Sequence, residues 1–219
     1  MASYQLLLYF HILLMVFWLG TDIGVFIAGL HFIDPKLPLE RRRGAMDVGF
    51  IIDRFPRVCF VAILPIGAQL AWLRGLLVVR SSIMDILWAC CLMWMTAVVA
   101  GMLMNGRPVA RLCHSVERVF QVTGLVLFGG GGFALLASHA EIPAWLAGKM
   151  IAFGLVCLFA ILLERAFEPV MPTFEEIVRN GSAPELEGKL RNSMYRSYLW
   201  VLSIYAAVIV AGFLGTVKP

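Results

Sequence analysis

Six long apolar stretches account for most of this 219-residue chain. A helix of about 20 apolar residues crosses the hydrocarbon core of a bilayer, which is about 30 Å thick. We therefore predict membrane-spanning helices at residues 5–31, 57–79, 83–104, 118–138, 143–164 and 196–216. Because a helix pairs its own backbone groups, such a chain is expected to fold as an all-α membrane bundle of about six helices.

The composition agrees with a membrane protein. Hydrophobic residues make up 61% of the chain and charged residues 15%, against roughly 45–50% and about 25% in soluble domains. The polar stretches at 32–56 and 165–195 are too short for a soluble domain, so we expect one domain over residues 1–219. The first apolar stretch is too long for a signal-peptide core and has no basic leader, which favours a retained helix.

The second polar stretch has its own helix signals. Thr173 to Glu176 and Ser182 to Glu185 both have the spacing of a capping box, with Asn180-Gly181 as a turn between them. We expect a short helix before the turn and, after it, a helix that continues into the last span.

Lysine and arginine residues predict the orientation of the bundle. Fourteen of them fall on one side of the six predicted spans, and the other side holds only Arg74, Arg80, Lys149 and Lys218. Cytoplasmic loops of membrane proteins carry the excess of positive charge, so both termini are expected on the outer, periplasmic side of a bacterial inner membrane. Basic residues are not interleaved with aromatic ones, which gives no sign of nucleic-acid binding.

One face of the first predicted helix carries polar side chains. At 100° per residue, Tyr4, His11, Trp18 and Asp22 fall on one stripe. An intramembrane carboxylate normally faces the bundle interior, so Asp22 orients the stripe inward. We expect Asp22 between the first two spans, with Arg57 or backbone donors as its partner.

The four histidines divide between the two ends of the bundle. His11 and His139 belong to the outer half, whereas His31 and His114 lie at the inner surface. Neutral imidazole is a common metal ligand and a usual axial ligand of haem iron. Hydrogen bonding to backbone or lipid headgroups is the alternative for each of them. His31 lies about 200° around the helix from His11, so one site cannot use both.

Two motifs and the chain end resemble a known group of membrane proteins. They are His11-x6-Trp18-Leu19-Gly20, the segment from Pro143 through Trp145 to Lys149-Met150, and the terminal Val217-Lys218-Pro219. Together they resemble the CopD-like superfamily, which includes copper-resistance membrane proteins, the membrane part of a bacterial urate oxidase and HemJ-type protoporphyrinogen oxidases. The resemblance covers the first, fifth and sixth spans.

The resemblance implies a haem protein. In HemJ-type proteins the first-helix histidine binds haem b, a role that passes to His11, and Lys149 matches their lysine. This chain has Glu164 and Arg165 where those proteins have a histidine, so their enzymatic activity is not carried over and no catalytic residue is assigned. The implied function is electron transfer or redox chemistry with a quinone, a redox protein or a partner subunit.

The residue pattern and the resemblance converge on the outer half. We expect His11 and His139 as iron ligands, Trp18 and Trp145 beside the cofactor, and Lys149 or Arg74 paired with haem propionates. His31 and His114 are weaker candidates for a second haem. The alternative function is a membrane subunit or transporter that binds no haem, in which the polar stripe lines a copper or proton path.

The methionines, the cysteines and a run of glycines each allow more than one interpretation. Met93, Met95, Met102 and Met104 are possible Cu(I) ligands or simply core. The five cysteines have no CxxC pair or zinc-binding spacing and are expected as small buried side chains, with a disulfide framework as the alternative. Gly129 to Gly132 predicts either close helix packing or a flat cofactor against the backbone.

Overall fold

The computed structural model describes residues 2–104, 107–138 and 142–218, and its described elements are all helices. In chain order they are α1 (Ala2–Phe32), α2 (Leu39–Ile52), α3 (Arg54–Leu73), α4 (Ser81–Leu103), α5 (Pro108–Gly124), the π-helical stretch η1 (Leu125–Gly130), α6 (Gly131–Ala137), α7 (Ala144–Phe167), α8 (Val170–Asn180) and α9 (Pro184–Val217).

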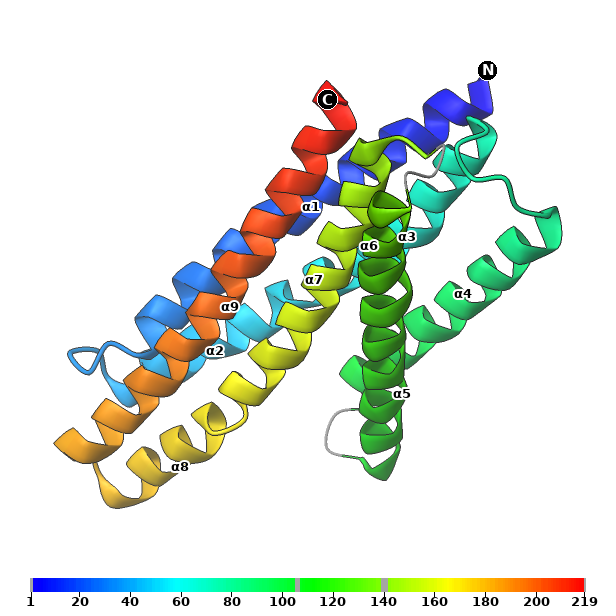
Figure 1. Ribbon diagram of the computed structural model, residues 1–219. Helices are drawn as coiled ribbons and strands as arrows, with labels where there is room; N and C mark the ends of the chain where they lie inside the picture. The colour runs from blue at the N-terminus through cyan, green and yellow to red at the C-terminus, as the bar shows by residue number, and fades with distance from the viewer. Residues whose placement is uncertain (1, 105–106, 139–141, 219) are drawn as a thin grey trace.

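Six helical segments are long and apolar enough to cross a membrane. They are α1, α2 with α3, α4, the run from α5 to α6, α7 with α8, and α9. Both chain ends lie at one end of the bundle (Figure 1), which we call the termini end. The prediction of an all-helical chain is thus confirmed over the described residues, which contain six helical segments able by length and composition to span a membrane.

Several predicted boundaries were wrong. The fourth span was expected to begin at residue 118, but α5 begins at Pro108, and α2 continues almost directly into α3. The predicted capping boxes do not form: Thr173 lies inside α8, where its hydroxyl donates to the Pro169 carbonyl, and Ala183 precedes α9. As expected, Asn180 ends α8 and α9 continues from the polar stretch into the last span.

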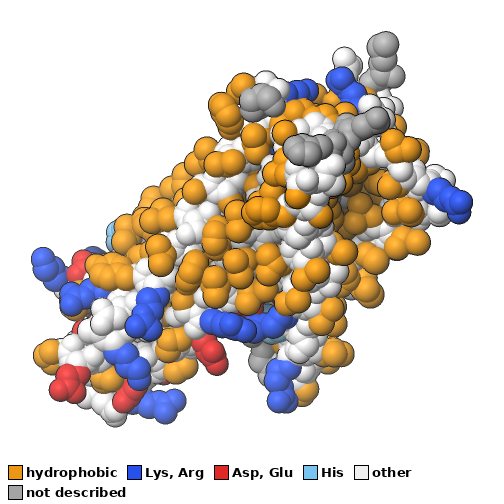
Figure 2. All heavy atoms as spheres, viewed as in Figure 1, with side chains coloured by type: hydrophobic (Ala, Val, Ile, Leu, Met, Phe, Trp, Pro, Cys, Tyr) orange, Lys and Arg blue, Asp and Glu red, His pale blue; other side chains and the backbone are white. Residues whose placement is uncertain are grey.

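Many apolar side chains cover the face of the molecule that Figure 2 shows. Exposed leucine, isoleucine, valine and phenylalanine residues occur along nearly every helix, an arrangement that suits lipid as the solvent. Charged side chains gather mainly at the end opposite the termini in this view (Figure 2).

Helix α1 packs antiparallel to α3 in a constant register. A Cβ atom at Gly67 would lie 2.9 Å from Cε1 of His11, and the ring of Trp18 lies 5.4 Å from that of Phe60. His11 and Trp18 are seven residues apart on α1, as are Phe60 and Gly67 on α3. The predicted stripe therefore faces the protein, and His31, on the far side, is exposed.

An aromatic layer fills the centre of the bundle. From Trp18 and Phe60 it continues to Trp94 on α4, whose ring lies 5.2 Å from Phe60 and stacks on Phe120 of α5 at 5.4 Å. Phe153 of α7 joins it at 5.4 Å from Phe60. One layer thus joins five helices between the two ends of the bundle.

A second core lies at the end opposite the termini. It forms where α2, α8 and the start of α9 enclose the end of α1, and its most deeply buried members are Phe32, Val170, Phe174, Ile177 and Leu190. The polar stretches 32–56 and 165–195 therefore fold as amphipathic helices against the bundle.

The glycine run of the fourth span is a packing surface for α7. Gly129 and Gly154 meet backbone to backbone: a Cβ at Gly154 would lie 2.5 Å from Gly129 N and Cα. A Cβ at Gly132 would lie 2.8 Å from both the Ala147 carbonyl oxygen and the Ile151 side chain. A Cβ at Gly130 would meet nothing within 4 Å. Of the two alternatives for this run, close helix packing is the one observed.

Candidate functional site

His11 lies in the interior, near the termini end of α1. Its ring occupies the space left by the missing side chain of Gly67 on α3. Its Nδ1 atom is enclosed and makes no hydrogen bond within the described residues, although the ring lies close to the backbone of Ile63 on α3. Buried polar atoms are nearly always paired, so this nitrogen is a candidate for binding a ligand.

Lys149 brings a second basic group to the same region. It lies near the start of α7 and within electrostatic reach of His11. Its Nζ packs on α9, where a Cβ at Gly215 would lie 2.7 Å from it. No ion pair of Lys149 is found in the part of the chain that the structure describes. Two basic side chains therefore lie within electrostatic reach of each other in the termini half, without a carboxylate partner among those residues.

The other residues expected around the cofactor have different surroundings. Trp18, 5% exposed, belongs to the central aromatic layer. The guanidinium of Arg74 lies 4.5 Å from the ring centre of Tyr4, and Lys218 Nζ lies 5.6 Å from that of Trp145. Arg74 and Trp145 thus form cation–π pairs at the termini end. His139 lies outside the described residues.

The histidines of the opposite end are not brought together. His31 is exposed, and its Nδ1 lies 3.0 Å from the Ile27 carbonyl oxygen of the same helix. His114 is an exposed side chain of α5 beside Glu117. No group of three His, Cys, Asp or Glu side chains that could hold a metal ion occurs within residues 2–104, 107–138 and 142–218.

The sulfur atoms do not converge on a copper site. Met93 is 57% exposed and Met104 is also exposed, so both face away from the interior. Met95 and Met102 pack against the central core. All five cysteines are free thiols, four of them buried, as expected for small core side chains.

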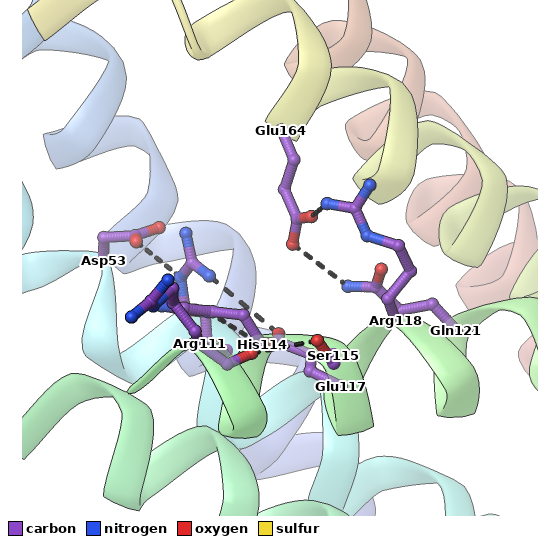
Figure 3. A network of polar contacts seen from close by, with 9 residues as sticks. Asp53, Arg111, His114, Ser115, Glu117, Arg118, Gln121 and Glu164 are labelled. Atoms are coloured by element: carbon purple, nitrogen blue, oxygen red, sulfur yellow. Dashed lines mark hydrogen bonds and ion pairs between the residues drawn. The ribbon is translucent and has the colours of Figure 1, made fainter. Parts of the chain in front are cut away.

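A cluster of ion pairs joins α3, α5 and α7 in the half away from the termini (Figure 3). We define the ion-pair cluster as Asp53, Arg57, His114, Glu117, Arg118, Gln121 and Glu164. Arg57 Nε donates to Asp53 Oδ2 at 2.6 Å, and its Nη1 lies 3.9 Å from Glu117 Oε1. Arg118 Nη2 donates to Glu164 Oε2 at 2.7 Å.

Two members of the cluster lie deep between helices. Glu117 is 6% exposed and Gln121 is 2% exposed. They share a face of α5 with the buried Ala110, Cys113 and Gly124. These five residues recur every three or four positions, which is the pattern of one helix face. That pattern could have identified Glu117 and Gln121 as inward-facing from the sequence alone.

Asp22 approaches this cluster without joining it. Its carboxylate is half-buried and within electrostatic reach of Asp53 and Arg57. Arg57, its expected partner, instead binds Asp53 and approaches Glu117. The expected Asp22–Arg57 pair is therefore absent from the described part of the bundle.

No family model, curated protein or solved structure matches this chain.

Proposed function

We propose that this is an integral membrane redox protein that binds a b-type haem in the termini half of the bundle, with His11 as the iron ligand. The observation that carries the proposal is the enclosed Nδ1 atom of His11, which has no partner within the described residues. Leaving a buried polar group unpaired costs about 1–3 kcal/mol. Retention of an imidazole at that cost favours a role in ligand binding.

The neighbouring residues fit the chemistry of a haem. Lys149 is an intramembrane cation within reach of His11, and haem carries two carboxylate groups that such a cation can bind through charge-assisted hydrogen bonds. Arg74 is a second cation at the same end. Gly67 lets the imidazole pack directly on α3 and so limits its orientation. His139 stays a predicted second ligand.

A bound haem would supply one-electron oxidation and reduction. The chain itself would position the imidazole of His11, and Lys149 would neutralise the carboxylates of the haem. The aromatic layer in the centre of the bundle would exclude water from the opposite end. Electrons would pass between a donor or acceptor at the termini end and a quinone, a redox protein or a partner subunit. The excess of basic residues at the opposite end supports an outer, periplasmic position for the termini in a bacterial inner membrane.

An absorption spectrum of the purified protein tests the proposal. We expect a Soret band and an α band that respond to dithionite. His11→Ala should remove or strongly shift them, whereas His31→Ala, an exposed histidine on the same helix, should leave them in place. A folded wild-type protein without haem after expression with added haem precursor would overturn the proposal.

A second candidate is a non-haem membrane subunit or transporter with a proton or copper path. The ion-pair cluster favours the proton version, because it places titratable groups inside an apolar bundle. The same spectrum separates the candidates, since this one predicts no haem bands.

A further inference from the structure

We propose that the ion-pair cluster, extended by Asp22 and Tyr205, is a proton-binding site in which the carboxylates of Glu117 and Asp22 take up protons from the aqueous phase opposite the termini. The proposal does not rest on haem binding, because each of its arguments concerns the half of the bundle that lies below the aromatic layer.

Glu117 and Gln121 form the first incomplete pair. They are four residues apart on α5 and therefore neighbours on one face. Gln121 donates from Nε2 to Glu164 at 3.4 Å, while its enclosed Oε1 accepts no hydrogen bond within the described residues. Glu117 approaches cationic or imidazole nitrogens only at 3.8 and 3.9 Å. A proton on Glu117 would give this carboxyl a donor on the same face of α5 as the unpaired oxygen.

Asp22 and Tyr205 form the second incomplete pair. On the α1–α9 contact, a Cβ at Gly29 would lie 2.7 Å from the Tyr198 hydroxyl, and one at Gly212 would lie 3.0 Å from Sδ of Met15. Asp22 is midway between Met15 and Gly29, and Tyr205 is midway between Tyr198 and Gly212.

This antiparallel register places Asp22 opposite Tyr205. The Tyr205 hydroxyl is enclosed and has no partner in the described chain. The Tyr205 hydroxyl can donate to an ionised Asp22 carboxylate or accept from a protonated one, so either state would satisfy it. Only the protonated state also avoids an ionised carboxylate inside the apolar bundle.

The charges in this region do not balance. Four acids lie there, namely Asp22, Asp53, Glu117 and Glu164, against the two arginines that make ion pairs, Arg57 and Arg118. His114 is exposed beside Glu117, and Arg111 is exposed one turn closer to the start of α5. If all four acids were ionised, two carboxylates would lack an arginine partner. Asp53 and Glu164 are partly exposed beside their arginines, whereas Glu117 is 6% exposed, so its ionisation costs most. Protons on Glu117 and Asp22 leave these four acids and two arginines with no net charge.

The polar first turns of α5 connect the cluster to the end of the bundle opposite the termini. An open hollow of about 570 Å³ on the surface of α5 is lined by His114, Ser115, Arg118, Val119, Val122 and Thr123. Its polar lining belongs to the turns of α5 closest to the end opposite the termini. Protons can therefore enter beside His114 and Arg118, whereas the aromatic layer separates the cluster from His11.

A proton fits this site better than a metal ion. The guanidinium groups of Arg57 and Arg118 occupy carboxylate oxygens that a metal would need, at 2.6 and 2.7 Å. In the uptake step one proton leaves a hydronium ion or buffer acid and one carboxylate becomes a carboxylic acid. No oxidant or reductant takes part.

Infrared spectroscopy of the full-length protein in lipid nanodiscs tests the proposal without reference to haem. A protonated carboxyl has a C=O band that is distinct from carboxylate bands and shifts in D2O. We expect such bands at neutral pH, with one lost in Glu117→Gln and another in Asp22→Asn. Tyr205→Phe should shift the Asp22 band and leave the Glu117 band unchanged, a result that a merely structural role would not give.

Glu175→Gln is the matched control. Glu175 is an exposed acid whose carboxylate pairs with Arg43 at 2.6 Å, and its substitution should change neither band. If wild-type protein shows no protonated carboxyl band at neutral pH, the proposal is wrong. It is equally wrong if the bands persist in Glu117→Gln and Asp22→Asn. Should either variant fail to fold, the Tyr205→Phe shift still decides the Asp22 part, and Gln121→Leu, which removes the acceptor, should shift the Glu117 band.

Discussion

Arg42 and Glu187 form a two-pronged ion pair between α2 and α9. Arg42 Nη1 and Nη2 donate to the two carboxylate oxygens at 2.8 and 2.9 Å, and Nε donates to the Phe32 carbonyl at 2.8 Å. The guanidinium is 1% exposed and packs on the ring of Phe174. A single buried arginine thus links α1, α2, α8 and α9.

We expect Arg42→Met to destabilise the end opposite the termini by about 3–5 kcal/mol, because it leaves a partly buried carboxylate with only the Ser182 hydroxyl as donor and removes the side-chain donor to the Phe32 carbonyl. Arg43→Met is the control: Arg43 forms an exposed pair with Glu175, and such pairs contribute about 0–1 kcal/mol. Denaturant unfolding in detergent measures both. Equal losses in the two variants would contradict this account of Arg42.

The glycines of the η1–α7 contact give a second prediction. A Cβ at Gly154 would lie 2.5 Å from backbone atoms of Gly129, which cannot move without separating the helices. Gly154→Ala should therefore lower the thermal unfolding temperature strongly. Gly130→Ala meets nothing within 4 Å and should be neutral or stabilising by up to about 1 kcal/mol, the difference in helix propensity. A thermal shift assay compares the two, and an unaffected Gly154→Ala variant would show that the contact is not needed.

The sequence was enough to predict the spans and the inward stripe of α1, since hydropathy and helical periodicity are properties of one segment at a time. It was not enough for the ion-pair cluster. Polar residues in the first turns of α5 placed the expected start of the span at 118, which left Glu117 in a loop. Arg57 pairs with Asp53 and not with Asp22. Which carboxylate it reaches depends on how the helices are placed relative to one another, and the pattern of residues within one helix does not contain that information.

The His11 site offers a prediction that uses the backbone of α3. A Cβ at Gly67 would lie 2.9 Å from Cε1 of His11, so Gly67→Ala should rotate the imidazole. We expect a shifted haem spectrum or reduced haem content. Gly20→Ala, on the same helix as His11 and with nothing within 4 Å, is the control. A Gly67→Ala spectrum identical to wild type would argue against His11 as the ligand.

The orientation of the bundle can be tested at two connections. Lys36 lies between α1 and α2 at the end opposite the termini, and Val78, which is 96% exposed, lies between α3 and α4 at the termini end. Single cysteines there, in a background without native cysteines, should react with a membrane-impermeant maleimide from opposite sides. Because the end that holds Lys36 carries the excess of basic residues, it is expected on the cytoplasmic side, so Lys36→Cys should react only after the cells are opened. Labelling of both positions in intact cells would refute the topology.

The final prediction joins the haem and proton proposals through Asp22. If protons bind in the half opposite the termini when an electron enters at the His11 site, reduction becomes easier as the pH falls, and the midpoint potential decreases as the pH rises. Asp22→Asn keeps the side-chain size and removes one proton-binding group, so it should preserve haem content while flattening this dependence over the pH range in which the wild-type Asp22 carboxyl loses its proton. Glu175→Gln, an exposed acid, should keep the wild-type slope. Redox titration followed at the α band over a range of pH measures each slope. An unchanged slope in Asp22→Asn, with its carboxyl band lost in the infrared, would mean that Asp22 binds a proton without coupling it to the haem.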